Sequence, residues 1–276
     1  MTTTTAIGGA ESAVATDRRT GGFGWWASDV WQIAVRNVKH IVRSPELIMY
    51  ALFQPVMFIL LFNFVFGGAI KVPGGDYAQF LMPGIFVQMV LFGSVAGMTS
   101  GVAQDMQRGL MDRFRSMPMY RSPVLAGRTV SELARSLVAI VVMVVAGLLI
   151  GFRFETGLLP AVAGFALLLL FGYALTWLAA FIGMSVKSPE AAQSAGTIWL
   201  FPFSFISSAF VPSTSMPGWL RVYADHSPMT VAVDSLRALF TGSDPGTSIL
   251  QLLGWSIGLI VVFAPLATWK FARAQR

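Results

Sequence analysis

Six long apolar segments alternate with shorter polar ones along the 276 residues of the chain. Each segment has roughly the 20 residues that a helix needs to cross the hydrocarbon core of a bilayer. We therefore predict six transmembrane helices, at 47–70, 80–103, 129–151, 160–186, 191–211 and 249–269. The third is the least apolar, since Glu132 and Arg135 fall in its first two turns, at a spacing that lets them pair at the membrane interface. The predicted fold class is an all-α integral membrane protein.

The composition supports this fold class and limits the chemistry. Only 12% of the residues are charged and 55% are hydrophobic, whereas soluble domains carry about 25% charged residues. The chain has no cysteine, which excludes disulfides and thiol chemistry. Residues 1–27 are rich in threonine, glycine and alanine and lack the apolar core of a signal peptide. We predict a disordered cytoplasmic tail at 1–27 and one membrane domain at 28–276.

The distribution of basic residues predicts how the chain is oriented. With six spans, fifteen of the nineteen lysines and arginines fall on one side of the membrane. The other side holds only Lys71, Arg153, Arg221 and Arg237. Because cytoplasmic loops carry an excess of lysine and arginine, both termini and the loop at 104–121 are predicted to be cytoplasmic.

Two amphipathic segments are predicted on the cytoplasmic side. Residues 28–44 form a basic helix lying on the inner membrane surface, with Trp31 on its apolar face and Arg36, Lys39 and Arg43 on its basic face. The second segment, 104–121, lies between two spans. Its apolar face holds Met106, Leu110, Phe114 and Met117, and its charged face holds Asp105, Arg108, Asp112 and Arg115.

The segment at 104–121 has the chemistry of a docking helix. Its apolar side chains can fill a cleft on a partner protein, and its arginines can meet acidic residues there. The alternative is an ordinary positively charged loop. On the opposite side of the membrane, residues 212–240 contain Ser227-Pro228, a helix-start signal. An apolar stripe and a possible pair between Asp234 and Arg237 follow, and we predict a short helix dipping into the outer leaflet.

Span five carries a stripe of small polar residues. On an unbroken helix these residues fall within about a 100° arc, and Pro202 is expected to bend the helix. The stripe consists of Gln193, Thr197, Ser204, Ser207 and Ser208. It can line a translocation path, or it can pack helices closely, as small polar residues often do in membranes.

Other side chains extend the candidate path. Trp199 and Phe203 offer aromatic surface on which a planar ring system can stack, although such residues often face lipid. Gln54 and Gln88 are amides within spans one and two, and each needs a partner or a polar path. The row Gly93, Gly97 and Gly101 in span two favours close helix packing over transport.

Several functions lack their usual residues. The chain has no GxxxxGK[ST] phosphate loop. His40 and His226 lie on opposite sides of the predicted membrane, so they cannot share a metal, and no cluster of catalytic residues suggests a membrane enzyme. Apart from Glu132 and Arg135 the spans carry no charged residue, whereas ion-coupled carriers usually need such groups. A passive channel, or a transporter powered by another subunit, remains.

Short motifs in a fixed order resemble a known family. They are RSPE before span one, QP in span one, LMPGI opening span two, DRFRSMP in the first cytoplasmic loop, GFR after span three, and MPGWL, SPMT and LRAL on the outer side. Together they resemble the permease subunits of the second ABC-transporter permease class, and most closely the daunorubicin/doxorubicin-resistance membrane subunits. The resemblance covers nearly the whole chain, from about Trp25 to Lys270.

The resemblance implies a function and partners. Such permeases sit in the bacterial plasma membrane and pair as two copies around a central path, above two copies of a separate ATPase that binds ATP and Mg²⁺. The permease itself needs no cofactor and is not an enzyme. The cargo implied is an amphipathic drug, with a lipid, glycolipid or polyketide as the alternative. Residues 104–121 match the coupling helix, whose contacts are expected from Arg108, Asp112, Arg113, Phe114, Arg115, Met117 and Pro118.

Overall fold

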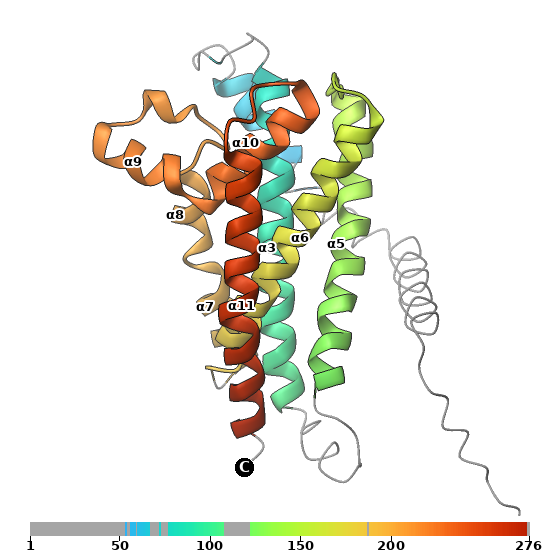
Figure 1. The fold of residues 1–276 in the computed structure, drawn as a ribbon, viewed down its shortest axis with the longest axis vertical. Helices are drawn as coiled ribbons and strands as arrows, with labels where there is room; N and C mark the ends of the chain where they lie inside the picture. The colour runs from blue at the N-terminus through green and yellow to red at the C-terminus, as the bar shows by residue number, and fades with distance from the viewer. Residues whose placement is uncertain are drawn as a thin grey trace, which may run out of the picture.

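The computed structural model describes residues 53, 56–58, 60–66, 72, 77–107, 122–186 and 188–274. Within these residues all regular structure is helical. Four helices in this described part of the chain are long and apolar enough to cross a membrane. They are α3 (Tyr77–Gln107), α5 (Ser122–Ile150), α6 (Leu158–Gly183) and α11 (Ser248–Ala274), and they run side by side in Figure 1. They correspond to predicted spans two, three, four and six.

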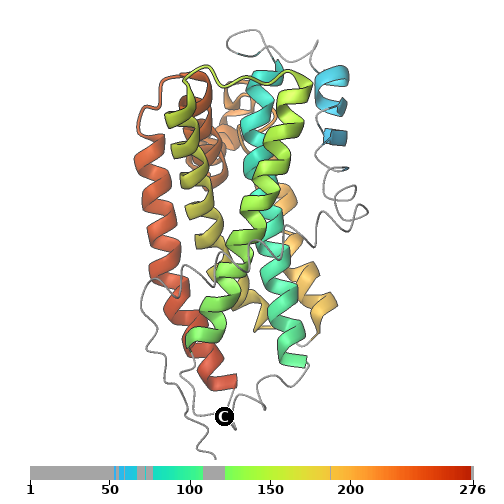
Figure 2. The same ribbon diagram turned by 90° about the vertical axis from the view of Figure 1, so that its right-hand side faces the viewer.

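Helix α3 forms the centre of the bundle. It packs against α5, α6, α7 and α10, while α11 packs mainly against α6 at the edge (Figures 1 and 2). Two thirds of the apolar stretch of α3 is buried, at 67%, compared with 11% for α11. Large apolar side chains such as Leu250, Ile257 and Val261 therefore cover the exposed side of α11. An integral membrane protein turns a surface of this kind to lipid.

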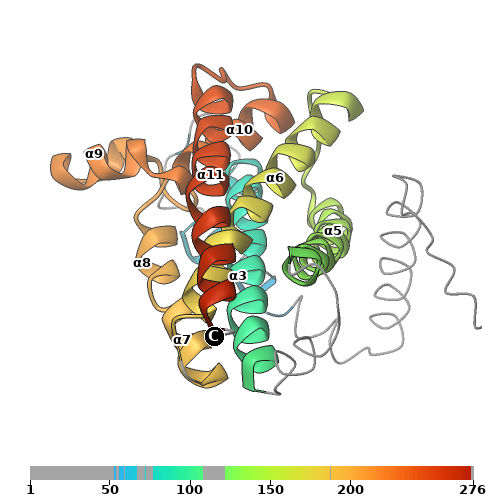
Figure 3. The same cartoon turned by 60° about the horizontal axis from the view of Figure 1, so that its bottom comes forward.

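Predicted span five is not one continuous helix. The chain forms α7 (Pro189–Thr197) and α8 (Leu200–Phe205), separated by a turn at Ile198 and Trp199. Pro202 explains the interruption, because it has no N–H to donate to the carbonyl of Ile198 and its ring crowds that carbonyl. The bend expected from Pro202 is present, but the helix also ends at Phe205, well before the predicted end at residue 211. Figure 3 shows both short helices on the side of α3 opposite to α5.

The segment after α8 contains η2 (Ser213–Ser215), α9 (Gly218–His226) and α10 (Pro228–Thr241). The helix predicted at Ser227-Pro228 is confirmed, since the Ser227 hydroxyl accepts a hydrogen bond from the backbone N–H of Met229 at 3.3 Å. The apolar stripe of α10 is fully buried within the chain, at Met229, Val233, Leu236 and Phe240. It therefore packs in the protein core, and entry of this segment into the outer leaflet stays a prediction.

Several predicted elements lie outside the described residues. These are the tail at 1–27, the basic helix at 28–44 with Trp31, Arg36, Lys39 and Arg43, and the path residue Gln54. Of the predicted coupling helix, only 104–107 is described, as the end of α3. Within predicted span one the structure describes a π-helix, η1 (Leu61–Phe66). The count of six spans and the coupling contacts from Arg108 to Pro118 stay predictions.

Candidate functional site

The candidate translocation path lies along the seam between α3 and the pair α7–α8. At one end of this seam the backbones almost touch, because a Cβ atom on Gly84 would lie 2.4 Å from the carbonyl oxygen of Ala209. Further along, the rings of Phe92 and Phe201 meet edge to face, with their centroids 5.2 Å apart. Gly84 on α3 and Gly196 on α7 allow the two sides of the seam to come close together. A Cβ atom on Gly196 would lie 2.8 Å from the side chain of Thr99 on α3.

Two of the predicted path residues lie in the protein core. The side chains of Ser204 and Ser207 are both completely buried, and the Ser207 hydroxyl donates to the Ser204 carbonyl at 2.5 Å. Ser204 belongs to α8, whereas Ser207 and Ser208 lie beyond its end. The prediction that the serines share one arc of an unbroken helix is therefore wrong. Contact between these residues and a transported molecule stays a prediction.

The remaining path residues of this segment lie closer to the surface. Gln193 is exposed on α7, and the Thr197 hydroxyl donates to the Gln193 carbonyl at 2.7 Å. Trp199 and Phe203 are partly buried, with their ring centroids 5.5 Å apart in an edge-to-face contact. The stripe is thus divided between an accessible part on α7 and a buried part after Trp199.

Unmet hydrogen bonds mark the buried part of the seam. Gly84, Gln88 and Phe92 are spaced four residues apart, so they share one face of α3, and that face meets α8 and the segment after it. Among the described residues, four buried side-chain atoms have no hydrogen-bond partner. They are Gln88 Nε2 on this face of α3, Trp199 Nε1 and Ser204 Oγ in the α7–α8 segment, and Trp177 Nε1 on α6. A polar group without a partner is costly in a membrane interior. The seam is therefore chemically suited to a polar ligand group or a bound water.

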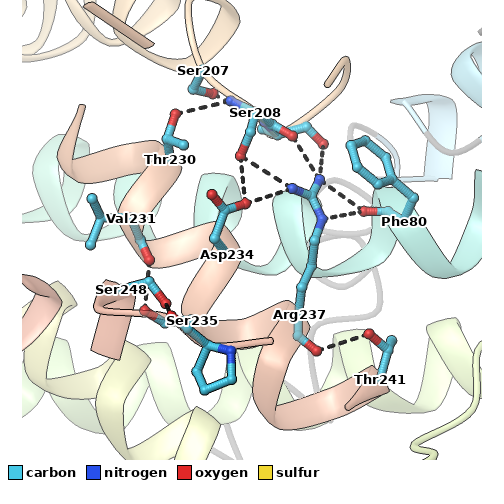
Figure 4. A network of polar contacts seen from close by, with 12 residues as sticks. Phe80, Ser207, Ser208, Thr230, Val231, Asp234, Ser235, Arg237, Thr241 and Ser248 are labelled. Atoms are coloured by element: carbon cyan, nitrogen blue, oxygen red, sulfur yellow. Dashed lines mark hydrogen bonds and ion pairs between the residues drawn. The ribbon is translucent and has the colours of Figure 1, made fainter. Parts of the chain in front are cut away.

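A second polar cluster surrounds Arg237 at the α10 end of the bundle (Figure 4). Its Nη1 donates to Asp234 Oδ1 at 2.9 Å and to the Ser208 hydroxyl at 3.1 Å. Its Nη2 donates to the carbonyls of Ser208 at 2.6 Å and Phe80 at 3.0 Å, and Nε also donates to Phe80, at 3.1 Å. One side chain thus joins α10, the start of α3 and the segment after α8.

Arg237 stays charged although it is buried. Its guanidinium carbon lies 3.6 Å from the centre of the Phe80 ring, close enough for a cation–π contact. Burial lowers the pKa of Arg237 to about 10, and the carboxylate of Asp234 opposes that shift. The side chain therefore remains protonated at neutral pH. The sequence predicted the pair with Asp234 on the polar face of its helix, but not the contacts of Arg237 with Phe80 and Ser208.

A groove of about 880 Å³ opens beside this cluster. Four carboxylates line it, with Arg237 as the cationic side chain among its lining residues. They belong to Glu155, Asp225, Asp234 and Asp244. Arg237 bonds to Asp234 and Arg221 pairs with Asp225. The carboxylates of Glu155 and Asp244 therefore leave the groove negative, which attracts cations.

A third polar cluster joins α3 and α5. The predicted pairing of Glu132 with Arg135 is confirmed, at 2.8 Å between Arg135 Nε and Glu132 Oε2. The pair does not lie at the end of its helix, however, because α5 begins at Ser122, ten residues before Glu132. The sequence suggested a later start at 129, and the location of the pair at the membrane interface stays a prediction. Among the described residues, no group of three metal-ligand side chains occurs.

Comparison with known proteins identifies the family. The sequence profile described as ABC-2 type transporter matches residues 28–241, well over half of the chain. The chain belongs to the ABC-2 type transporter family. Among its relatives, the daunorubicin resistance ABC transporter permease protein DrrB1 of Streptomyces coeruleorubidus is 35% identical over 237 residues, which are 86% of this chain and 82% of the relative. The doxorubicin resistance permease DrrB of Mycobacterium tuberculosis is 29% identical over 236 residues, 86% and 78% of the two chains.

These findings confirm the resemblance drawn from the motifs. The chain is an ABC-2 permease, homologous to drug-resistance transporter subunits, with apolar helices that fit a multi-pass membrane protein. Its relatives are named as transport components.

Proposed function

We propose that the chain is the membrane subunit of an ATP-driven exporter in the bacterial plasma membrane, with both termini in the cytoplasm. Two copies form the translocation path, and two copies of a separate ATPase bind beneath them, holding ATP and Mg²⁺. The observation that carries the proposal is an ABC-2 permease sequence without a phosphate loop of its own. A subunit of this kind needs energy from a partner, and the amphipathic segment at 104–121 is the docking surface that we assign to that partner.

We further propose an amphipathic, cationic aromatic drug as the cargo. The seam between α3 and α8 combines ring contacts, such as Phe92 with Phe201, and the unpartnered Nε2 of Gln88. An aromatic molecule with polar substituents meets both features. The acidic groove near Arg237 favours a cation over an anion at the α10 end of the bundle. Relatives named for resistance to daunorubicin and doxorubicin support the same class.

ATP hydrolysis tests the partnership. We expect the purified chain alone to hydrolyse no ATP, and the chain with its cognate ATPase to show hydrolysis that rises when drug is added. The physical reason is that the chain lacks the phosphate loop whose backbone N–H groups and lysine hold the ATP phosphates in ATPases of this kind. Comparable hydrolysis by the isolated chain would show that the absence of this motif was misleading. A passive channel would not bind the ATPase at all.

A bulky residue in the seam tests the path. We expect Ser204→Leu to lower drug transport per folded dimer, or to change which drugs are moved, while the ATPase stays bound. Ser204 is completely buried on α8, so added volume there must displace the groups packed around it. The measurement pairs drug efflux with dimer melting.

The control is Ser256→Leu, because Ser256 is equally buried but lies on α11, away from the seam. Overpacking at either site typically costs about 1–3 kcal/mol. Transport that falls only in proportion to the surviving dimer in both variants would support the packing alternative for Ser204.

A further inference from the structure

The cluster of Glu132 and Arg135 connects two helices rather than lying within one. Arg135 Nη2 is 2.8 Å from Glu132 Oε2 and also donates a hydrogen bond to the backbone carbonyl of Gly93 on α3. Beside it, the buried hydroxyls of Ser94 on α3 and Ser136 on α5 lie 3.3 Å apart. Charged and neutral hydrogen bonds thus link α3 and α5 at one level.

The glycines of α3 make room for the ion pair. A Cβ atom on Gly97 would lie 2.7 Å from Glu132 Oε2 and 2.8 Å from Arg135 Nη2, and one on Gly93 would lie 3.4 Å from that nitrogen. Contacts under 3.0 Å require one of the atoms to move. These two glycines, predicted to serve helix packing, therefore accommodate the charged groups of the neighbouring helix.

The pair contacts the middle of α3 from the start of the apolar stretch of α5. Gly93 is near the middle of α3, which runs from Tyr77 to Gln107, so it is roughly 20 Å from either end at 1.5 Å per residue. The apolar stretch of α5 that is long enough to cross a membrane begins at Glu132, so the pair lies in its first turn. The side chain of Glu132 is 12% exposed and that of Arg135 is 41% exposed. A charged side chain beside an apolar span is costly unless it is paired, and Arg135 is bonded both to Glu132 and to a carbonyl of α3.

The position of the pair in the chain suggests what it does. Helices α3 and α5 are the two that lead into and out of the segment at 104–121. We propose that Glu132 and Arg135 are positioning residues that hold α3 and α5 together as one unit. Movement of the docking segment then reaches both helices at once, instead of separating them. The consequence for transport rests on the proposed function, whereas the connection between the helices does not.

Spin labels test the connection directly. The chain lacks cysteine, so labels can be placed at Gln104 on α3 and Ser122 on α5 without removing others. We expect a narrow distribution of the distance between the two labels in the parent chain and a broader one in Arg135→Met. Arg135→Lys should be intermediate, because lysine keeps the positive charge but cannot donate to two acceptors in the fixed geometry of a guanidinium group. Arg221→Met, which removes an exposed arginine on α9, should leave the distribution narrow. An unchanged width in Arg135→Met would overturn the proposal.

Transport separates positioning from mere stability. In the complex with the ATPase, Arg135→Met is expected to move at least about fivefold fewer drug molecules per ATP hydrolysed. Fivefold is the smallest effect typical of coupling between two sites. ATPase binding and basal hydrolysis are expected to persist. If Arg135→Met folds poorly, Glu132→Gln with Arg135→Met removes both charges and gives the same test. An unchanged ratio would overturn the role in coupling. A parent complex that moves no drug would contradict the proposed function, and the spin labels still decide whether the pair joins the helices.

Discussion

Replacing Phe114 by alanine, or Arg113 by glutamate, is expected to abolish drug export while the chain still inserts into the membrane. Both residues belong to the segment proposed to dock the ATPase. Aromatic side chains and arginine are enriched at the centres of protein interfaces, and truncating a residue that dominates binding costs about 2 kcal/mol or more. That loss weakens binding roughly thirtyfold. Pull-down of the ATPase by the solubilised permease measures the loss of binding, and drug efflux from cells measures the loss of export.

The control for the charge reversal is Arg153→Glu. Arg153 is exposed and its Nη1 donates to the carbonyl of Leu148 at 3.0 Å, on the opposite side of the predicted membrane. The same change in charge there should leave ATPase binding intact. Normal pull-down by both Phe114→Ala and Arg113→Glu would remove the docking role from residues 104–121.

Loss of Arg237 is expected to destabilise the α10 end of the bundle strongly. In Arg237→Met, the carbonyls of Phe80 and Ser208 lose a charged donor, and Asp234 loses its cation. Breaking a buried charged pair costs about 3–5 kcal/mol. We expect the lower part of that range, because the side chain of Asp234 is 45% exposed and water can solvate it. Thermal melting of the purified dimer in detergent measures the loss.

Two variants make the Arg237 result specific. Arg221→Met removes an exposed arginine whose pair with Asp225 spans 3.5 Å, and surface pairs contribute at most about 1 kcal/mol. Arg237→Lys retains the charge but cannot reach every acceptor at once, so its melting temperature should fall between those of the parent and Arg237→Met. Equal melting temperatures for Arg237→Met and Arg221→Met would show that the Arg237 cluster in Figure 4 adds little to the stability of the protein.

Local signals in the sequence predicted much of the fold. The four long helices occur where the sequence has apolar segments of membrane-spanning length. Such segments are easy to recognise, because apolar residues recur in every turn of the helix. Ser227 was recognised as a helix cap from its own side chain and the proline that follows it. The pair of Glu132 with Arg135 was also predictable, since its spacing of three residues places both on one helical face.

Features that depend on distant residues were not predictable in this way. The stripe of span five assumed one helix, and the interruption at Ile198 and Trp199 separates its members. Burial of Arg237 depends on Phe80, 157 residues away in the sequence, and on the loop at Ser208. A partial signal existed, because Arg237 stands among the apolar residues of α10. Nothing local could show that its acceptors are backbone carbonyls of other elements.

Drug uptake into sealed vesicles tests the central claim most directly. The permease and its cognate ATPase are reconstituted together, and vesicles with the ATPase facing outward are supplied with ATP, Mg²⁺ and a fluorescent cationic aromatic drug. We expect the drug to accumulate inside only when permease, ATPase and hydrolysable ATP are all present. Equal entry of drug without ATP, or without the ATPase, would mean that the permease is a passive channel and would contradict the account.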